Sequence, residues 1–403
     1  MQKTTFICPY CFERIKLSEV QFRCTNKRCQ DVDDVEITVY ENGNVNMPKK
    51  GKPCFGYKSK NPFTVPASAV CPSCSKESHK RICPACHNEL PESTINGKDM
   101  IISIVGSRAT GKSHFVGVII KELKDRIAKS FDGALEGFAD SYKRWEENFG
   151  NKLYTTGEKL DLTKSSLQNT DNGAYRPLIF KLRLRHKVLF KEMIESFTFV
   201  FFDSAGEDLD DEDTMSTVNK YICRSAGIIF LLDPMQIPAV SSQLDESVVS
   251  RASGLGANVR ATGADDIMTR VSNLIRNERK ISDETKIDIP VAAVFSKFDA
   301  VEPIIPEDCT VLQPSPHCSE KVFDMSDWHN VNAEISSLLN EWDAGAFISQ
   351  LETNYSKYSY FGVSALGLNN NPTTDGRIER PRPHRIEDPL LWILKENGVI
   401  KGK

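Results

Sequence analysis

The sequence has no apolar run long enough to cross a lipid bilayer. Its longest apolar stretches, such as FTFVFF at 197–202 and GIIFLL at 227–232, fall far short of the roughly 20 residues that a membrane-spanning helix needs. The first residues, MQKTTFICPYC, also lack the basic stretch and apolar core of a secretory leader. We therefore expect a cytoplasmic protein without a membrane span.

A strong charge of either sign is missing as well. The 403 residues carry a net charge of −4, which is spread unevenly. Residues 1–98 hold 15 Lys and Arg against 10 Asp and Glu, a net of +5, and the remainder has a net of −9. An excess of this size is compatible with binding nucleic acid or an acidic protein, but an ordinary solvated surface explains it equally well.

The cysteines are unevenly distributed, because nine of the twelve fall within the first 86 residues. Eight of them form four close pairs, and in a reducing cytosol such pairs are typical of metal ligands rather than disulfides. Eight thiolates predict two structural Zn²⁺ ions, each held tetrahedrally by two pairs. The pairs are Cys8 and Cys11, Cys24 and Cys29, Cys71 and Cys74, and Cys83 and Cys86.

We expect sequential pairing, in which the first two pairs hold one zinc ion and the last two hold the other. A crossed arrangement remains open, and Cys54 or His87 is an alternative ligand because Cys24 and Cys29 have the least typical spacing. Residues 1–98, called the cysteine head below, are thus predicted to be a double zinc-ribbon domain with a linker, which needs its metal to fold. Its zinc ions would be structural, and the head is a candidate site for protein or nucleic acid.

Residues 99–403 have a different pattern, in which apolar runs alternate with longer mixed-charge stretches. This pattern predicts an α/β domain with a mostly parallel sheet flanked by helices, and with long insertions near 130–176, 234–288 and 300–327. We expect strands at 100–105, 177–184, 197–202, 227–232, 290–295 and 360–365. We expect helices at 113–129, 265–280 and 328–352, and a short one near DPLLWILKE at 388–396.

The stretch GSRATGKS at 106–113 lies between the first predicted strand and the first predicted helix. The pattern GxxxxGK[ST] binds phosphate, because its glycines let backbone N–H groups surround a β-phosphate at the start of a helix. Lys112 would bridge the β- and γ-phosphate oxygens, and the Ser113 hydroxyl would be a Mg²⁺ ligand. The predicted phosphate-contacting residues are Gly106, Ser107, Arg108, Ala109, Thr110, Gly111, Lys112, Ser113 and His114.

Three later stretches complete the predicted nucleotide site and together predict that the base is guanine. In DSAG, Asp203 would hold Mg²⁺ through water and the Gly206 amide would contact the γ-phosphate. In SKFD, which consists of Ser296, Lys297, Phe298 and Asp299, the carboxylate would accept the guanine N1–H and N2–H₂ groups, which adenine lacks. The residues Ser364, Ala365 and Leu366 would then place backbone amides near guanine O6.

In this order, the phosphate loop, DSAG, SKFD and Ser364-Ala365 motifs resemble those of the TRAFAC class of P-loop GTPases over residues 100–396. Together with the cysteine pairs, RICPACHNELP and RIEDPLLWIL, they more narrowly resemble the bacterial "double-GTPase" family. That resemblance implies a GTP-driven switch or assembly step in an antiphage defence system. It also implies a second GTPase or another protein of the same system as partner, or a homodimer.

The sequence departs from the usual GTPase pattern at several positions. The threonine that would close on Mg²⁺ is predicted to be Thr163, with Thr155, Thr156 and Thr170 as alternatives. Glu207 stands where a water-orienting glutamine is common, so it would either act as a base or slow hydrolysis by repelling the γ-phosphate.

Two further departures lie in the loops that would hold the nucleotide. Arg108 would face a partner, reach the phosphate of a second subunit as an arginine finger, or simply face solvent. Ser296 replaces a commoner asparagine. We therefore expect a GTPase that converts GTP to GDP slowly without a partner. The alternatives are a zinc-dependent nucleic-acid-binding or adaptor protein whose nucleotide domain barely hydrolyses GTP, and an ATP-dependent P-loop enzyme.

Overall fold

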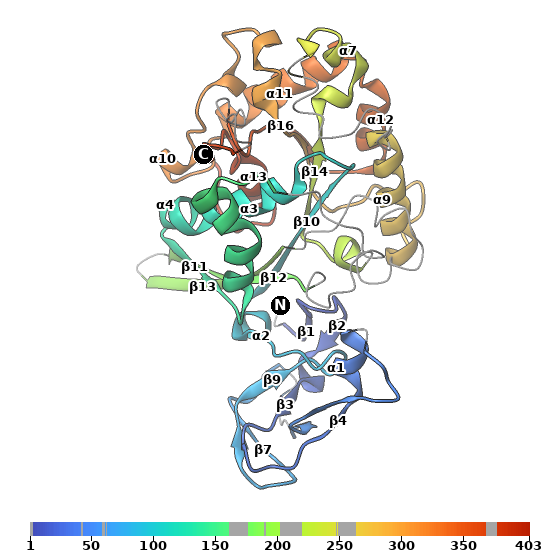
Figure 1. Ribbon diagram of the computed structural model, residues 1–403, viewed down its shortest axis with the longest axis vertical. Coiled ribbons are helices and arrows are strands. Elements are labelled where there is room, and N and C mark those ends of the chain that lie inside the picture. The colour runs from blue at the N-terminus through green and yellow to red at the C-terminus, as the bar shows by residue number, and fades with distance from the viewer. Residues whose placement is uncertain are drawn as a thin grey trace.

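The computed structural model describes most of the chain. The described residues are 3–41, 43–58, 61, 63–160, 176–188, 191–201, 220–246, 248, 263–367 and 377–403. Figure 1 shows two parts, with the cysteine head below a larger α/β unit and the N-terminus close to their junction.

A seven-stranded sheet forms the centre of the larger unit, in the order β11-β12-β13-β10-β14-β15-β16. The five strands from β13 to β16 in that order pair in parallel, whereas β11 and β12 pair antiparallel at one side. The fold is therefore mixed α/β with a mostly parallel sheet, as predicted. The strands are β10 (Lys98–Gly106), β11 (Gly133–Gly137), β12 (Leu178–Val188), β13 (Lys191–Phe201), β14 (Gly227–Leu232), β15 (Val291–Phe295) and β16 (Tyr358–Gly362).

Helices cover both faces of this sheet because its strands are apolar on both sides. Along β10, Ile102 and Ile104 pack with helices α3 and α13, while Ile101 and Val105 pack with α9, α11 and α12 on the other face. The helices are α3 (Lys112–Glu122), α4 (Ala128–Ser130), α5 (Ser141–Trp145), α7 (Pro238–Ser241), α9 (Ala264–Arg279), α10 (His317–Glu320), α11 (Met325–Glu341), α12 (Gly345–Asn354) and α13 (Asp388–Glu396).

Each expected strand and helix overlaps an observed element, but several bounds differ. Strand β13 begins at Lys191, six residues before the expected strand 197–202, and the expected helix 113–129 is interrupted by a π-helical turn at Leu123–Ile127. The predicted helix 328–352 is in fact two helices, α11 and α12, separated by a turn in which Asp343 adopts a positive φ of 58°. Its apolar stripe continues across the break, which is why periodicity alone did not reveal it. The short edge strand β11 was not predicted, because GALEG lacks the β-branched and aromatic residues typical of strands.

The cysteine head contains small antiparallel sheets rather than one large core. The sheets are β1-β2, β6-β3-β9, β4-β5 and β7-β8. Its elements are β1 (Thr5–Ile7), β2 (Arg14–Lys16), β3 (Gln21–Arg23), β4 (Val32–Asp34), α1 (Val35–Tyr40), β5 (Lys49–Gly51), β6 (Cys54–Phe55), β7 (Ala69–Val70), β8 (Glu77–Ser78), β9 (Lys80–Ile82) and α2 (Glu92–Asn96). Helix α2 then leads directly into β10 of the main sheet.

Candidate nucleotide site and metal centres

The predicted phosphate loop lies between the end of β10 and the start of α3. Its turn is made by two left-handed residues, Ala109 with φ 64° and Gly111 with φ 84°, and Gly111 is the N-cap of α3. The Lys112 ammonium is buried inside the loop, where it donates to the carbonyl oxygens of Gly106 and Ser107, both at 2.8 Å. The loop therefore has the strand-turn-helix geometry in which backbone N–H groups point toward a bound anion.

Gly106 has to be a glycine for packing reasons. A Cβ atom there would lie 2.6 Å from the Leu231 carbonyl oxygen on β14 and 2.8 Å from Thr110 Oγ1. The Thr110 hydroxyl in turn donates to the Ser107 carbonyl oxygen at 2.9 Å, which closes the loop internally. The first glycine of the motif thus lets the loop lie against the neighbouring strand.

The predicted base motifs lie at the same edge of the sheet. Because β10, β14, β15 and β16 are parallel neighbours, the residues that follow each strand meet at their carboxyl ends. Lys297 and Asp299 follow β15, and Ser364, Ala365 and Leu366 follow β16. Asp299 and Leu366 line one cavity of about 280 Å³. The structure thus brings the SKFD and Ser364–Leu366 segments together.

The Ser296 side chain does not face that cavity. It is buried, and its hydroxyl donates to the Leu232 carbonyl oxygen at 3.0 Å. The Ser364 hydroxyl similarly accepts a hydrogen bond from the Gly367 backbone N–H at 2.9 Å. Ser296 therefore ties its loop to the end of β14, and Ser364 stabilises its own loop. Within these motifs the cavity is lined by Phe298, Asp299 and Leu366.

Two residues that the sequence analysis missed connect the phosphate loop to the base motif. Gln236 accepts from the Ser107 hydroxyl at 2.9 Å and donates to the Arg108 carbonyl oxygen at 3.3 Å. Asp233, three residues earlier, forms an ion pair of 2.7 Å with the Lys297 ammonium and caps the turn at Met235. The only available signal was an aspartate directly after the apolar strand GIIFLL, at the edge where the other motifs end.

Asp233 is held in an unusual electrostatic environment. Its side chain has an exposed fraction of 0%. Burial raises the pKa of its carboxyl group, and the neighbouring Lys297 ammonium opposes that increase. Because a buried carboxylate without a partner is costly, the ion pair holds Lys297 in place through a strong local constraint.

His114 connects the start of α3 to the chain segment before residue 161. Its Nε2 atom accepts a hydrogen bond from the Leu160 backbone N–H at 3.3 Å. Burial, together with the positive charges of Lys159 and Lys297, lowers the pKa of His114 to about 4. The imidazole is therefore neutral at pH 7, as a hydrogen-bond acceptor must be.

Several predicted residues lie outside the described part of the chain. They are Thr163 and its alternative Thr170, together with Asp203, Gly206 and Glu207. Thr156 is described, and its hydroxyl donates to the carbonyl oxygens of Asn151 and Lys152. Arg108 is exposed, and Ser113 and His114 are partly buried at the first turn of α3.

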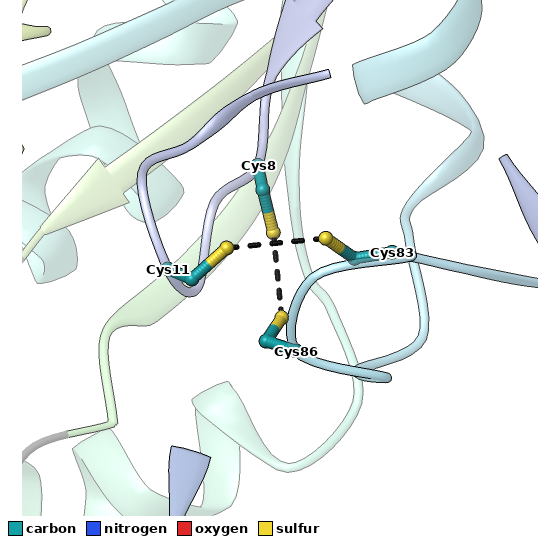
Figure 2. A group of neighbouring side chains, drawn as sticks. All are labelled: Cys8, Cys11, Cys83 and Cys86. Carbon is teal, nitrogen blue, oxygen red and sulfur yellow. Dashed lines mark hydrogen bonds between the residues drawn. The ribbon is translucent and has the colours of Figure 1, made fainter. Parts of the chain in front are cut away.

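The eight paired cysteines form two groups of four, but the sequential pairing is wrong. The first pair joins the fourth, so that Cys8, Cys11, Cys83 and Cys86 converge (Figure 2). The second pair joins the third, so that Cys24, Cys29, Cys71 and Cys74 converge. The crossing has a physical cause. The strand β9, which leads to Cys83, pairs with β3, and this pairing brings the turn at Cys83 and Cys86 back to the turn at Cys8 and Cys11.

The sulfur atoms have the spacing that a zinc ion requires. Four thiolates at about 2.3 Å from a tetrahedral Zn²⁺ lie roughly 3.8 Å from one another. The distance between the sulfur atoms is 3.8 Å for Cys8 and Cys86 and 3.9 Å for Cys11 and Cys83. In the second group, Cys24 and Cys74 are 3.6 Å apart. Both groups therefore fit structural zinc ions.

The two alternative ligands, Cys54 and His87, lie together but outside both cysteine groups. His87 Nδ1 is 2.7 Å from an oxygen of Asp34, whose other oxygen accepts from Arg23 at 2.8 Å. Arg23 also donates to the His87 carbonyl oxygen at 2.9 Å. Against the opposing effect of burial, the pKa of Asp34 is lowered by the Ile37 backbone N–H, the His87 imidazole and the Arg23 guanidinium. Since a cation already pairs with Asp34, we interpret this group as a structural network rather than a third metal site.

Comparisons with known proteins give distant similarities. No protein-family model matches the chain. The chain is 25% identical over 364 residues, or 86% of each chain, to the proposed ESX-1 scaffolding and assembly protein SaeC of Mycolicibacterium smegmatis. It also resembles the solved S. cerevisiae Ski7 GTPase-like domain, bound to GTP, at 14% identity and a TM-score of 0.33. That match covers 76% of this chain and 51% of the solved chain, so this chain spans about half the length of the solved one.

Similarities this distant do not show a family, so the fold and the site rest on the contacts given above. Among the residues that the structure describes, no helix combines the length and apolarity needed to span a membrane. The chain is thus a mixed α/β protein with a phosphate-loop geometry and two four-cysteine groups.

Proposed function

We propose that this chain binds guanine nucleotide at the carboxyl edge of the main sheet and hydrolyses GTP to GDP. The observation that supports the proposal is that the phosphate loop, Asp299 and Ser364–Leu366 all follow strands of one parallel sheet, at its carboxyl edge. After β14, Gln236 contacts the phosphate loop and Asp233 contacts Lys297 of the base motif. Guanine offers two adjacent donors to Asp299, whereas adenine would leave that carboxylate unpaired.

The chemistry of hydrolysis would be an in-line attack of water on the γ-phosphate. Lys112 would stabilise the charge that develops on the phosphate oxygens, and Ser113 would be a ligand of Mg²⁺ together with Thr163 and Asp203. Glu207 would orient the attacking water. Since a carboxylate there would also repel the γ-phosphate, we expect slow turnover unless a partner or a second copy of the chain accelerates hydrolysis.

The biological setting that we propose is a step in the assembly of a multi-protein complex in the cytoplasm. The similarity to SaeC, which is described as a scaffolding and assembly protein, supports this setting. The family resemblance of the motifs would place such an assembly in a bacterial defence system, with a second GTPase as partner. In both of these proposed settings, GTP would control the assembly of a protein complex.

Calorimetric titration with GTP, GDP and ATP in the presence of Mg²⁺ tests the nucleotide proposal. We expect GTP and GDP to bind and ATP to bind at least about 100-fold more weakly. The substitution Asp299→Asn should reverse the preference toward xanthosine triphosphate, whose base has a carbonyl oxygen where guanine has its amino group. Equal binding of ATP and GTP by the wild type would refute guanine specificity.

The adaptor alternative makes a different prediction for the same protein. The net charge of +5 on the cysteine head favours it. An adaptor would bind GTP without turnover and would be retained on RNA or DNA columns in a salt-dependent manner. Measurable turnover that Lys112→Ala abolishes would instead support the GTPase.

A further inference from the structure

The first cysteine group is built into the nucleotide-binding unit through one aromatic side chain. Phe12 directly follows Cys11 and ends the turn that Cys8 begins, with a positive φ of 57°. Its side chain has an exposed fraction of 0% and packs in the core of the main sheet together with Ile101 and Val105. The Phe12 ring lies 5.2 Å from the ring of Tyr221.

Tyr221 carries this contact to the strand that ends in the phosphate loop. Its hydroxyl donates to the Ile102 carbonyl oxygen, and its own carbonyl oxygen accepts from the Ser103 hydroxyl at 3.5 Å. Both partners lie in the middle of β10, which ends at Gly106. A continuous path of packed and hydrogen-bonded groups therefore leads from the turn at Cys8 and Cys11 to the phosphate loop.

The same turn also holds the beginning of β10. The Ile7 backbone N–H donates to Asp99 at 3.0 Å, and the Lys3 ammonium lies 3.2 Å from the other oxygen of that carboxylate. Beside Phe12, Glu13 forms an ion pair of 2.6 Å with Lys220, the residue before Tyr221. Residues 3–13 thus contact β10 at its start and, through Tyr221, at its centre.

Among the described residues, the core around the second cysteine group contains no residue of the main sheet. Its buried neighbours, Phe22 and Phe55, belong to the cysteine head itself. The first group instead shares its core with Ile179 of β12. The two groups therefore differ in what their loss would disturb.

We propose that Phe12 and Tyr221 are positioning residues for the phosphate loop, so that zinc in the first cysteine group and guanine nucleotide stabilise each other's binding. Zinc in the second group is independent of the nucleotide. The inference rests on the proposed function, because it requires that a nucleotide binds. Loss of the first zinc would release the turn, withdraw Phe12 from Tyr221 and leave a cavity beside β10. Since coupling between two binding sites is reciprocal, the nucleotide must protect that zinc in return.

The experiment follows the release of zinc from the full chain to a colorimetric chelator, with and without saturating GDP. The wild type should release two zinc ions. The double variant Cys24→Ser with Cys71→Ser should lose the second site, so comparison with the wild type shows which kinetic phase of zinc release belongs to which group. We expect GDP to slow release from the first group at least fivefold and to change release from the second group by less than twofold. Equal protection of both groups, or protection of neither, would overturn the proposal.

Calorimetry with GDP supplies the second readout. Phe12→Leu and Tyr221→Phe should each raise the Kd for GDP about three- to tenfold, whereas the matched control Phe22→Leu in the second group should leave it unchanged. If Phe12→Leu fails to fold, Tyr221→Phe decides, because it removes only the hydroxyl that contacts Ile102. An unchanged Kd for Tyr221→Phe would then refute the coupling.

The two proposals fail in different ways. Absence of GDP binding by the zinc-loaded wild type would refute the proposed function. Binding of GDP without selective protection of the first zinc would refute only this inference.

Discussion

The Lys297 ammonium lies 2.7 Å from Oδ2 of Asp233, and this ion pair joins the end of β15 to the end of β14. Lys297 itself has a left-handed backbone with φ 53°. A lysine in that backbone conformation is held by its surroundings, because residues other than glycine seldom adopt a positive φ. Asp233 thus fixes the direction of Lys297 in the motif that carries Asp299.

Replacing Asp233 by asparagine should weaken both stability and nucleotide binding. The variant removes the carboxylate that pairs with the partly buried Lys297 ammonium, which costs about 2 to 3 kcal/mol of unfolding free energy. We expect the Kd for GDP to rise about tenfold. Urea denaturation and calorimetry measure the two effects. The double variant Asp233→Asn with Lys297→Met should recover part of the stability, and failure to recover any would argue against the pair.

Gln236 should affect the phosphate loop more than the base pocket. Gln236→Ala removes the acceptor of the Ser107 hydroxyl and the donor to Arg108. Each lost hydrogen bond costs about 1 kcal/mol, so binding of GDP should weaken roughly five- to thirtyfold. The preference for GDP over ADP should stay unchanged, because Asp299 is not contacted. A change in that preference, measured by competition with ADP, would show that the bridge acts on the base.

The pH dependence of stability should report the neutral state of His114. Its pKa falls from 6.5 in the unfolded chain to about 4 in the folded one. Between these values the unfolded state binds a proton that the folded state does not, so this contribution is complete above pH 6.5 and is lost as the pH falls to about 4.

His114→Gln keeps a side-chain oxygen that accepts from Leu160 but does not titrate. Its unfolding free energy should therefore fall less than that of the wild type between pH 7 and pH 4.5, by on the order of 2 kcal/mol. Urea titrations at both pH values provide the comparison. Parallel losses in the two proteins would assign the acid sensitivity to other groups.

Zinc analysis of double variants can distinguish the two pairings of the cysteines. In the observed arrangement Cys8 and Cys86 belong to the same group. The variant Cys8→Ser with Cys86→Ser should therefore lose one of two zinc ions and keep the other. Sequential pairing would place these residues in different groups, and the same variant would then lose both. Atomic absorption on the purified protein decides between these outcomes.

The sequence by itself determined the features that depend on local patterns. Apolar runs identified the main strands, because a buried parallel strand needs apolar residues on both faces. The glycines of GSRATGKS predicted the phosphate-loop turn, because only a short-range backbone geometry is involved. Closely spaced cysteines identified the candidate metal ligands for the same reason, since both thiolates of a pair lie on one turn.

Only the tertiary structure decided how these pieces combine. The pairing of Cys8 with Cys86 depends on β9 returning to β3, a contact between distant segments that no local spacing encodes. Asp233 gains its role from the adjacency of β14 and β15, and Phe12 gains its role from packing against Tyr221. Local chemistry thus predicted which residues are candidates for binding, whereas the long-range order of the strands determined which of them lie together.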